Sequence, residues 1–196
     1  MPSPYDESAR HYDRLLAPFE KWYISGLRRE AMSLLAPDEI ILEVGAGTGA
    51  NFEYYPRCRQ AVASEVSMKM IEVAKDKTRS IDLVGADVEA LPFPENYFDA
   101  AFASLVFCSV ASPEKAFAEL IRTLKPGGKI VLLEHVRPKG LLGRLFDLVS
   151  VLSVALIDDH FNRRTADSLS RSGFTIIEIR EKAFGIVNLI VGEIHK

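Results

Sequence analysis

The sequence is poor in cysteine, with only Cys58 and Cys108 among its 196 residues. Structural zinc sites and small disulfide-bonded folds need cysteines in pairs at characteristic spacing, and these two lie far apart. Two acids and a histidine follow one another at 158–160, but adjacent residues rarely converge on one ion. We therefore expect no bound metal and a reducing, cytoplasmic environment.

Long apolar runs are also missing. No uninterrupted apolar run reaches the ~18 residues that would suggest a membrane span. The opening MPSPYDESARHYDRLL has no apolar core of the kind that a signal peptide needs. The sequence predicts a cytoplasmic protein. Peripheral membrane contact through residues 140–157 or through the N-terminal helix is the second option.

The chain has no excess of positive charge, since its net charge is −3 and its pI is about 5.9. A nucleic-acid-binding protein that relies on a general basic field would carry the opposite balance. We expect no nucleic-acid partner. The oligomeric state is left open by the sequence.

Repeats, linkers and low-complexity tracts are absent, so residues 1–196 are predicted to form one domain. Within it we expect an N-terminal helical cap (1–36), a cofactor-binding core (37–135), and an acceptor-side helix with a final strand pair (136–196). The core alternates short β-rich runs with helical patterns or loops, which implies parallel strands joined by crossovers. FTIIEIR and IVNLIVGEI, joined by the short KAFG, are close enough to pair only as antiparallel neighbours. The fold class is therefore α/β: a doubly wound, mostly parallel seven-stranded sheet with an antiparallel last strand.

Three glycines in LEVGAGTGA (42–50) lie between an apolar strand and a predicted helix. Without Cβ atoms, Gly45, Gly47 and Gly49 allow a sharp turn and let a ligand approach the backbone. Gly45-x-Gly47-x-x-Ala50 also satisfies a dinucleotide-binding pattern, and Glu65 follows at a distance suited to ribose hydroxyls. These residues alone leave nicotinamide and other nucleoside cofactors open.

Two carboxylates favour a cationic cofactor. Glu43 stands two residues before the first glycine, where it would repel the pyrophosphate of a nicotinamide cofactor. S-adenosylmethionine instead carries a sulfonium and an ammonium, which a carboxylate attracts. Asp87, just after the third predicted strand, can accept a hydrogen bond from an adenine amino group.

The sequence resembles the class I S-adenosylmethionine-dependent methyltransferases through LEVGAGTG, SEVS with Met70 after it, GADVEALPFPENYFD and LKPGGKIVLLEH. The resemblance implies a Rossmann-like methyltransferase fold and S-adenosylmethionine as cofactor. It assigns the methionine part of the cofactor to Glu43, Gly45, Ala46, Gly47 and Gly49, with Ser104 at its ammonium end. It assigns the ribose to Glu65 and the adenine to Val66, Met70, Asp87 and Val88.

A narrower resemblance concerns the methyl acceptor. LEVGAGTGANFEYYP, LVFCSV, LLEHV and DDHFNRRT look like the membrane-associated thiol methyltransferases, and the first half is similar to bacterial phospholipid N-methyltransferases. We therefore expect a small-molecule or lipid acceptor, with a thiol or a phospholipid amine favoured. The alternatives are a quinone-type C-methyltransferase, a nicotinamide-dependent oxidoreductase, and a non-catalytic member that binds cofactor and acts through a partner.

Methyl transfer requires a general base only when the acceptor arrives protonated. The candidates are His135, directly after the fifth predicted strand, together with Tyr12 and Asp159. Residues 140–157 read as a mostly apolar helix with a narrow polar stripe. This segment is either a buried core helix or a lid over a lipophilic acceptor.

Overall fold

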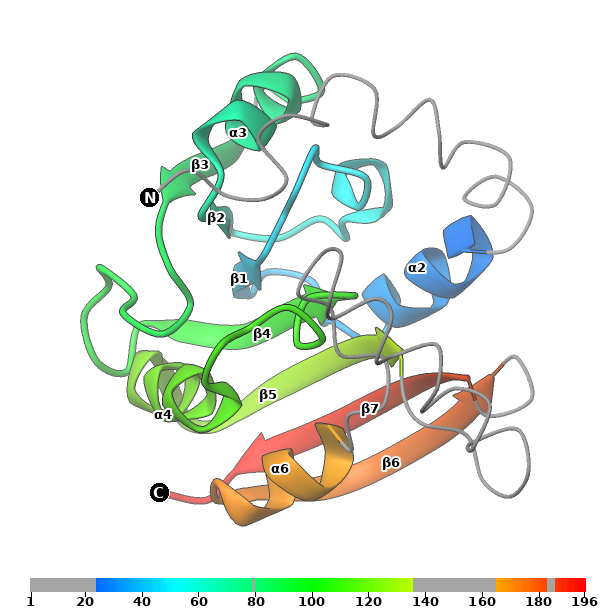
Figure 1. Ribbon diagram of the computed structural model, residues 1–196, viewed down its shortest axis with the longest axis vertical. Helices are drawn as coiled ribbons and strands as arrows, with labels where there is room; N and C mark the ends of the chain where they lie inside the picture. Colours follow the sequence, from blue (N-terminus) through cyan, green and yellow to red (C-terminus); the bar gives the residue numbers. More distant parts are fainter. Residues whose placement is uncertain (1–23, 79, 136–164, 183–185) are drawn as a thin grey trace.

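Seven strands form one sheet in the computed structural model, which describes residues 24–78, 80–135, 165–182 and 186–196 (Figure 1). The strands are β1 (Ile40–Val44), β2 (Gln60–Glu65), β3 (Ile81–Gly85), β4 (Phe98–Ser104), β5 (Leu124–His135), β6 (Phe174–Lys182) and β7 (Val187–Ile194). Their order across the sheet is β3-β2-β1-β4-β5-β7-β6. β1 to β5 run parallel, and β7 is antiparallel to both of its neighbours. The predicted fold class is confirmed.

The strand order reverses between β1 and β4. In an open α/β sheet, such a reversal opens a crevice at the carboxyl ends of the two strands, because their connections leave in opposite directions. β1 pairs with β4 through Ile41–Ala100 to Val44–Ala103, so the residues just after Val44 and Ala103 lie at the same edge. The glycines after β1 and Ser104 therefore share this edge of the sheet.

Both faces of the sheet are covered, because successive side chains of a strand point to opposite sides. The helices are α2 (Ser25–Met32), α3 (Met68–Lys75), α4 (Pro113–Thr123) and α6 (Thr165–Arg171). One face packs on α4 and α6 through a cluster that includes Leu42, Ala101, Ile130, Leu132, Phe117, Leu120 and Leu169. The other face packs on α2 through a cluster that includes Ile41, Ala100, Phe102, Val131, Leu133, Leu27 and Ala31.

Helix α2 is also held to the far edge of the sheet by charge. Glu30 on α2 accepts hydrogen bonds from Arg180 (3.1 Å) and Lys182 (2.9 Å) of β6. These two bonds and the apolar cluster give α2 a defined position beside the ends of β4 and β5 (Figure 1).

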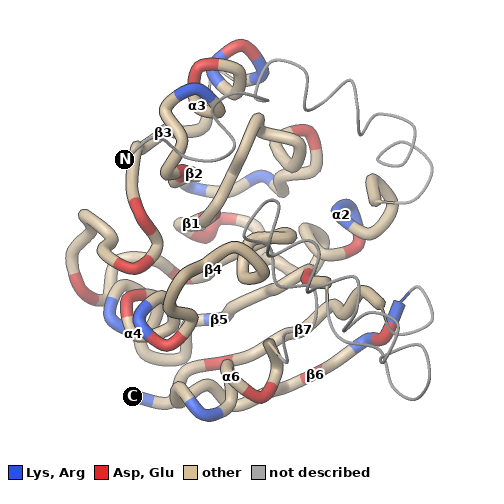
Figure 2. Tube along the Cα trace, in the orientation of Figure 1, with Lys and Arg blue, Asp and Glu red and all other residues tan. Residues whose placement is uncertain are grey.

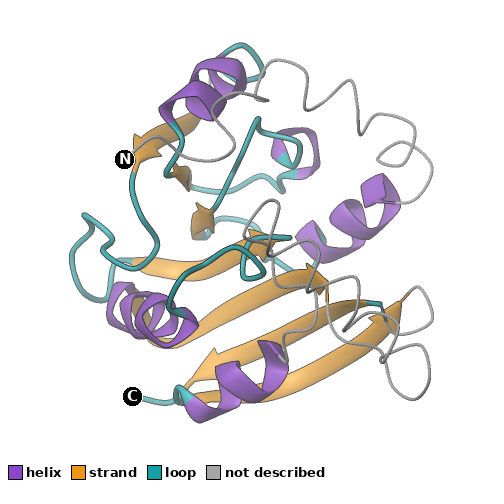
Figure 3. Ribbon diagram, viewed as in Figure 1, coloured by secondary structure: helices purple, strands orange, loops and turns teal. Residues whose placement is uncertain are grey.

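The sequence predicts a helix beginning near Gly49, and the structure differs there. The chain forms turns through residues 47–51 and then only the short 3-10 helix η2 (Phe52–Tyr54), as Figure 3 shows. Pro56 follows closely, and a proline disfavours helical geometry in the residue before it. Tyr55 accordingly has an extended backbone, with φ −57° and ψ 135°.

Acidic and basic positions are interspersed along α3, α4 and α6 (Figure 2). Within the described ranges, no helix combines the length and apolar character needed to cross a bilayer. The same ranges contain no group of three or more His, Cys, Asp or Glu side chains suited to a metal ion. The division at residues 36 and 135 remains a prediction, and 1–23 and 136–164 lie outside the described residues.

The stacked rings of Phe107 and Phe117 offer a test of this core. Their centroids lie 4.4 Å apart, and both side chains are fully buried. We expect Phe117→Ala to lower the free energy of unfolding by about 3–5 kcal/mol, because a large cavity replaces one ring. Urea titration measures the change, and Lys115→Ala, at an exposed position of the same helix, is the control. A loss below 1 kcal/mol, roughly the effect of a surface change, would contradict the packing described here.

Candidate active site

The segment 45–49, here called the glycine bend, has three glycines in the left-handed region. Their φ angles are +66° at Gly45, +55° at Gly47 and +80° at Gly49. A Cβ at Gly45 would lie 2.5 Å from a methyl group of Val106, and one at Gly49 would lie 2.5 Å from the Phe52 ring. A Cβ at Gly47 would meet nothing within 4 Å. The bend is thus closely packed at both ends and open at its centre, where a ligand can reach the backbone.

Glu65, at the end of β2, fastens the centre of this bend. One carboxylate oxygen accepts from the Gly47 N–H and the other from the Ser67 N–H, each at 2.9 Å. The side chain is 8% exposed. An ionised carboxylate has about four acceptor sites, so these two bonds leave capacity for ribose hydroxyls. The position fits the role that the sequence predicts.

The predicted adenine residues fall into two groups. Val66 is 59% exposed, and Asp87 is exposed with one carboxylate oxygen accepting from the Glu89 N–H at 2.9 Å. Met70, by contrast, is 3% exposed and belongs to the core side of α3. Met68, which the sequence analysis did not single out, is 57% exposed and lies against Gly85 at the end of β3. Val66 and Met68 are therefore the exposed apolar side chains of this region, and Val88, next to Asp87 in the chain, is half-buried.

Glu43 lies in a buried polar network rather than on an open surface. Its carboxylate is fully buried and accepts from the Asn51 amide at 2.6 Å and from the Tyr55 hydroxyl at 2.5 Å. Arg28 of α2 donates from Nη1 to Asn51 Oδ1 and to Ser104 Oγ, both at 2.8 Å. The network joins α2, β1, the residues that follow the glycine bend and the end of β4.

Burial and charge set the protonation of this network. Burial raises the pKa of Glu43 above its ordinary value of 4.5, while hydrogen bonds from Tyr55 and Asn51 and the charge of Arg28 act in the opposite direction. Burial and the neighbouring Glu43 raise the pKa of Tyr55 well above 10. Tyr55 therefore remains a hydrogen-bond donor at neutral pH.

Sequence reasoning missed Arg28, Asn51 and Tyr55. Asn51 and Tyr55 follow the glycines in ANFEYY, so their proximity to the bend was a usable signal. Arg28 lies 23 residues before Asn51 and 76 before Ser104, and its charge is unremarkable on a predicted helix.

Leu105 and Val106, here called the acceptor wall, follow the end of β4. Leu105 has φ +59°, a conformation that is costly for a leucine and that clusters at functional sites. Hydrogen bonds hold Leu105 in this conformation. The Leu105 N–H donates to the Leu133 carbonyl oxygen. The N–H groups of Val106 and Phe107 donate to the carboxylate of the buried Glu134, at 3.0 and 3.2 Å. Leu105 and Val106 are half-buried apolar residues, and Val106 lies against Gly45 of the glycine bend.

Of the three candidate bases, only His135 lies within the described residues. His135 is half-buried at the end of β5, directly after Glu134. Tyr12, Asp159 and the segment 140–157 lie outside the described residues. Cys108 is 5% exposed, and its thiol lies 3.6 Å from the Leu105 carbonyl oxygen.

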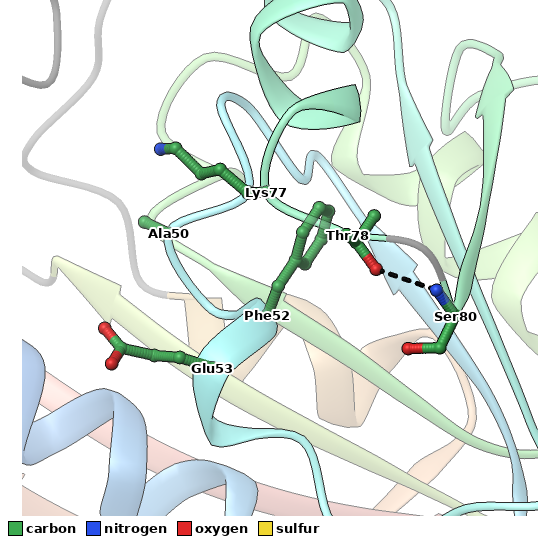
Figure 4. A pocket seen from close by; sticks show the side chains of 7 residues that line it. Ala50, Phe52, Glu53, Lys77, Thr78 and Ser80 are labelled. Carbon is green, nitrogen blue, oxygen red and sulfur yellow. Dashed lines mark hydrogen bonds between the residues drawn. The ribbon is translucent and has the colours of Figure 1, made fainter.

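A hollow of about 550 Å³ lies next to Gly49, between η2 and the α3–β3 connection (Figure 4). Its lining residues are Gly49, Ala50, Phe52, Glu53, Lys77, Thr78 and Ser80. Lys77 and Glu53 extend toward the same side of it. Glu65 and Asp87, to which the sequence analysis assigns the ribose and the adenine, do not line this hollow.

Comparison with known families and proteins points in the same direction as this geometry. Residues 42–132 match a family model described as a methyltransferase domain. Demethylmenaquinone methyltransferase of Renibacterium salmoninarum is 41% identical over 103 residues, which cover 52% of this chain and 44% of that protein. The ubiquinone/menaquinone biosynthesis C-methyltransferase UbiE of Francisella tularensis subsp. novicida is 29% identical over 184 residues, which cover 78% of this chain and 73% of that protein. The chain thus spans less than half of the first relative and about three quarters of the second.

Solved structures share the fold. A putative methyltransferase in complex with the Haloferax volcanii Trm112 methyltransferase activator aligns over 100% of both chains, with a TM-score of 0.82 and 16% identity. A possible histamine N-methyltransferase from Thermotoga maritima covers 97% of this chain and 98% of its own, with a TM-score of 0.77 and 22% identity. At these identities the likeness concerns the fold alone.

The position of Glu65 predicts a loss of cofactor affinity on mutation. We expect Glu65→Ala to weaken S-adenosylmethionine binding by about 1–3 kcal/mol, the usual range for hydrogen bonds to a charged group. Isothermal titration calorimetry measures the change, with Glu72→Ala, an exposed acid on α3, as the control. An unchanged dissociation constant would remove Glu65 from the site.

The raised pKa of Glu43 predicts a pH dependence. If Glu43 attracts the methionine ammonium, binding favours the ionised carboxylate, so affinity rises as the pH increases from 4.5 toward neutrality. The rise is at most about tenfold per pH unit, the limit for one linked proton. We expect Glu43→Gln to flatten this profile in calorimetry, because the titration of the ligand itself is common to both proteins. Equal slopes in the two proteins would show that Glu43 is not the titrating group.

Proposed function

We propose that the chain is a class I S-adenosylmethionine-dependent methyltransferase and that it methylates a ring carbon of a quinone-type acceptor. The observation that carries this proposal is the 41% identity over 103 residues to a demethylmenaquinone methyltransferase. The match of residues 42–132 to a methyltransferase domain counts against the nicotinamide alternative. The thiol or phospholipid acceptor favoured by the narrower sequence resemblance gains no support from the relatives named above.

The proposed division of labour follows from the site. S-adenosylmethionine, when bound, supplies a methyl group activated by a positively charged sulfur. Glu65 takes the ribose, the glycine bend holds the methionine part, and the Glu43 network faces the amino-acid end. Proximity and alignment of this kind can supply roughly 7–11 kcal/mol of the barrier reduction.

The acceptor wall is apolar, which suits a lipophilic ring. Val106 lies against Gly45 of the glycine bend with Leu105 next to it in the chain, and Glu134 accepts hydrogen bonds from the N–H groups of Val106 and Phe107. Such a wall excludes water from the transfer. It supports a lipophilic acceptor without distinguishing a ring from an alkyl thiol.

A ring carbon becomes nucleophilic when a neighbouring hydroxyl group loses its proton, so this acceptor requires a base. His135 is the candidate within the described residues, and Tyr12 and Asp159 remain candidates beyond them. We place the protein in the cytoplasm, with peripheral membrane contact as the route to a lipophilic acceptor.

The test is a turnover assay with methyl-labelled S-adenosylmethionine and three acceptors: a reduced demethylmenaquinone, an alkyl thiol and phosphatidylethanolamine. We expect label in the quinone product, located on a ring carbon by mass spectrometry, and loss of turnover in Glu65→Ala. Methylation of the thiol or the amine with none on the ring would contradict the proposal. Cofactor binding without transfer to any acceptor would favour the non-catalytic alternative.

A further inference from the structure

We propose that Arg28, on helix α2, binds the carboxylate of the methionine part of S-adenosylmethionine. Arg28 lies outside the residues matched by the methyltransferase domain model, which begins at residue 42. The inference concerns cofactor binding and does not depend on which acceptor is methylated.

The position of the nucleoside determines where the amino-acid end lies. Glu65 ends β2 and Asp87 follows β3, both on one side of β1, so the ribose and adenine occupy that side. The amino-acid end then extends the other way, over β1 and β4, where the strand order reverses. Ser104, at the end of β4, is bonded directly to Arg28 at 2.8 Å, and α2 lies beside this edge in Figure 1.

The charges at this place match a zwitterion. An amino acid brings one ammonium and one carboxylate, and burying either without a partner is costly. Glu43 is fully buried and suited to the ammonium, whereas Arg28 is 8% exposed and suited to the carboxylate. Among the described lysines and arginines, Arg28 is the one whose side chain is buried. Asn51 bonds to both Glu43 and Arg28 and so fixes their relative position.

The chemistry of arginine fits this role. A guanidinium group has five N–H donors in a planar fork that matches a carboxylate, and it remains charged when buried. In the structure Nη1 donates to two neutral oxygens, those of Asn51 and Ser104. A charge-assisted hydrogen bond to a carboxylate is roughly twice as strong as one between neutral groups. A hydrogen bond from the Arg28 guanidinium to the ligand carboxylate would therefore strengthen binding.

Lys77 is the competing cation. Its ammonium lies 3.4 Å from Thr48 Oγ1 within the glycine bend. The side chain is exposed, however, and an ion pair in contact with water contributes little to binding. Lys77 also lies two residues after the end of α3 and lines the hollow. It therefore provides a matched control for Arg28.

The test compares two ligands by calorimetry: S-adenosylmethionine and its decarboxylated analogue, which lacks only the carboxylate. We expect the wild-type protein to prefer S-adenosylmethionine. Arg28→Met should weaken S-adenosylmethionine binding by about 10–100-fold while leaving the analogue within about threefold, because only one ligand loses a charged hydrogen bond. Lys77→Met should preserve the preference of the wild-type protein.

Several outcomes would overturn the proposal. Equal weakening of both ligands by Arg28→Met would show that Arg28 only fastens α2 to the bend. Loss of the preference in Lys77→Met would transfer the role to Lys77, and equal affinity of the wild-type protein for both ligands would reject a carboxylate site altogether. If Arg28→Met does not fold, Arg28→Lys retains the charge without the planar fork. Arg28→Lys should then lose less affinity for S-adenosylmethionine than is expected for Arg28→Met, and its affinity for the analogue should stay unchanged. A failure to methylate quinones would leave these binding results unaffected.

Discussion

The site depends on one carboxylate that holds a tight glycine bend. Glu65 accepts from the backbone of Gly47 and of Ser67, so one side chain joins the turn after β1 to the start of α3. Each glycine of the bend has a positive φ that other residues adopt only at a cost. With its ends packed on Val106 and Phe52, the bend has little freedom, and its open centre lies beside the same carboxylate that can take the ribose. Glu65 thus fixes the backbone geometry of the bend, and in the proposed function it also recognises the ligand.

The second element of the account is the buried network that joins α2 to the sheet. Arg28 and Glu43 have opposite charges, and Asn51 connects them through hydrogen bonds. A buried charge is tolerated when it is paired and hydrogen-bonded, which explains how Glu43 can be fully enclosed. Because α2 is fixed by Glu30 and by an apolar cluster, the position of Arg28 is set by the fold and not by an exposed loop.

Much of this could be predicted from sequence where the signal is local. Alternating strand and helix patterns predict the sheet, and the glycines after an apolar strand predict the bend. The helix expected near Gly49 fails because Pro56 limits it. Met68 and Met70 have the same character in SMKMIEV, and only the packing of α3 shows that Met70 is the buried one. Arg28 contacts residues 23 and 76 positions away, and no local pattern encodes such a contact. The methyl acceptor is harder still to predict, because specificity for it depends on side chains outside the shared motifs.

The central claim is that the cofactor lies on the glycine bend at the carboxyl ends of β1 and β2. A crystal structure with S-adenosylhomocysteine tests it most directly. The account predicts ribose hydroxyls within hydrogen-bond distance of Glu65 and the ligand passing over Gly47. A ligand bound in the hollow beside Phe52 and Thr78, with Glu65 contacting only the backbone, would contradict it.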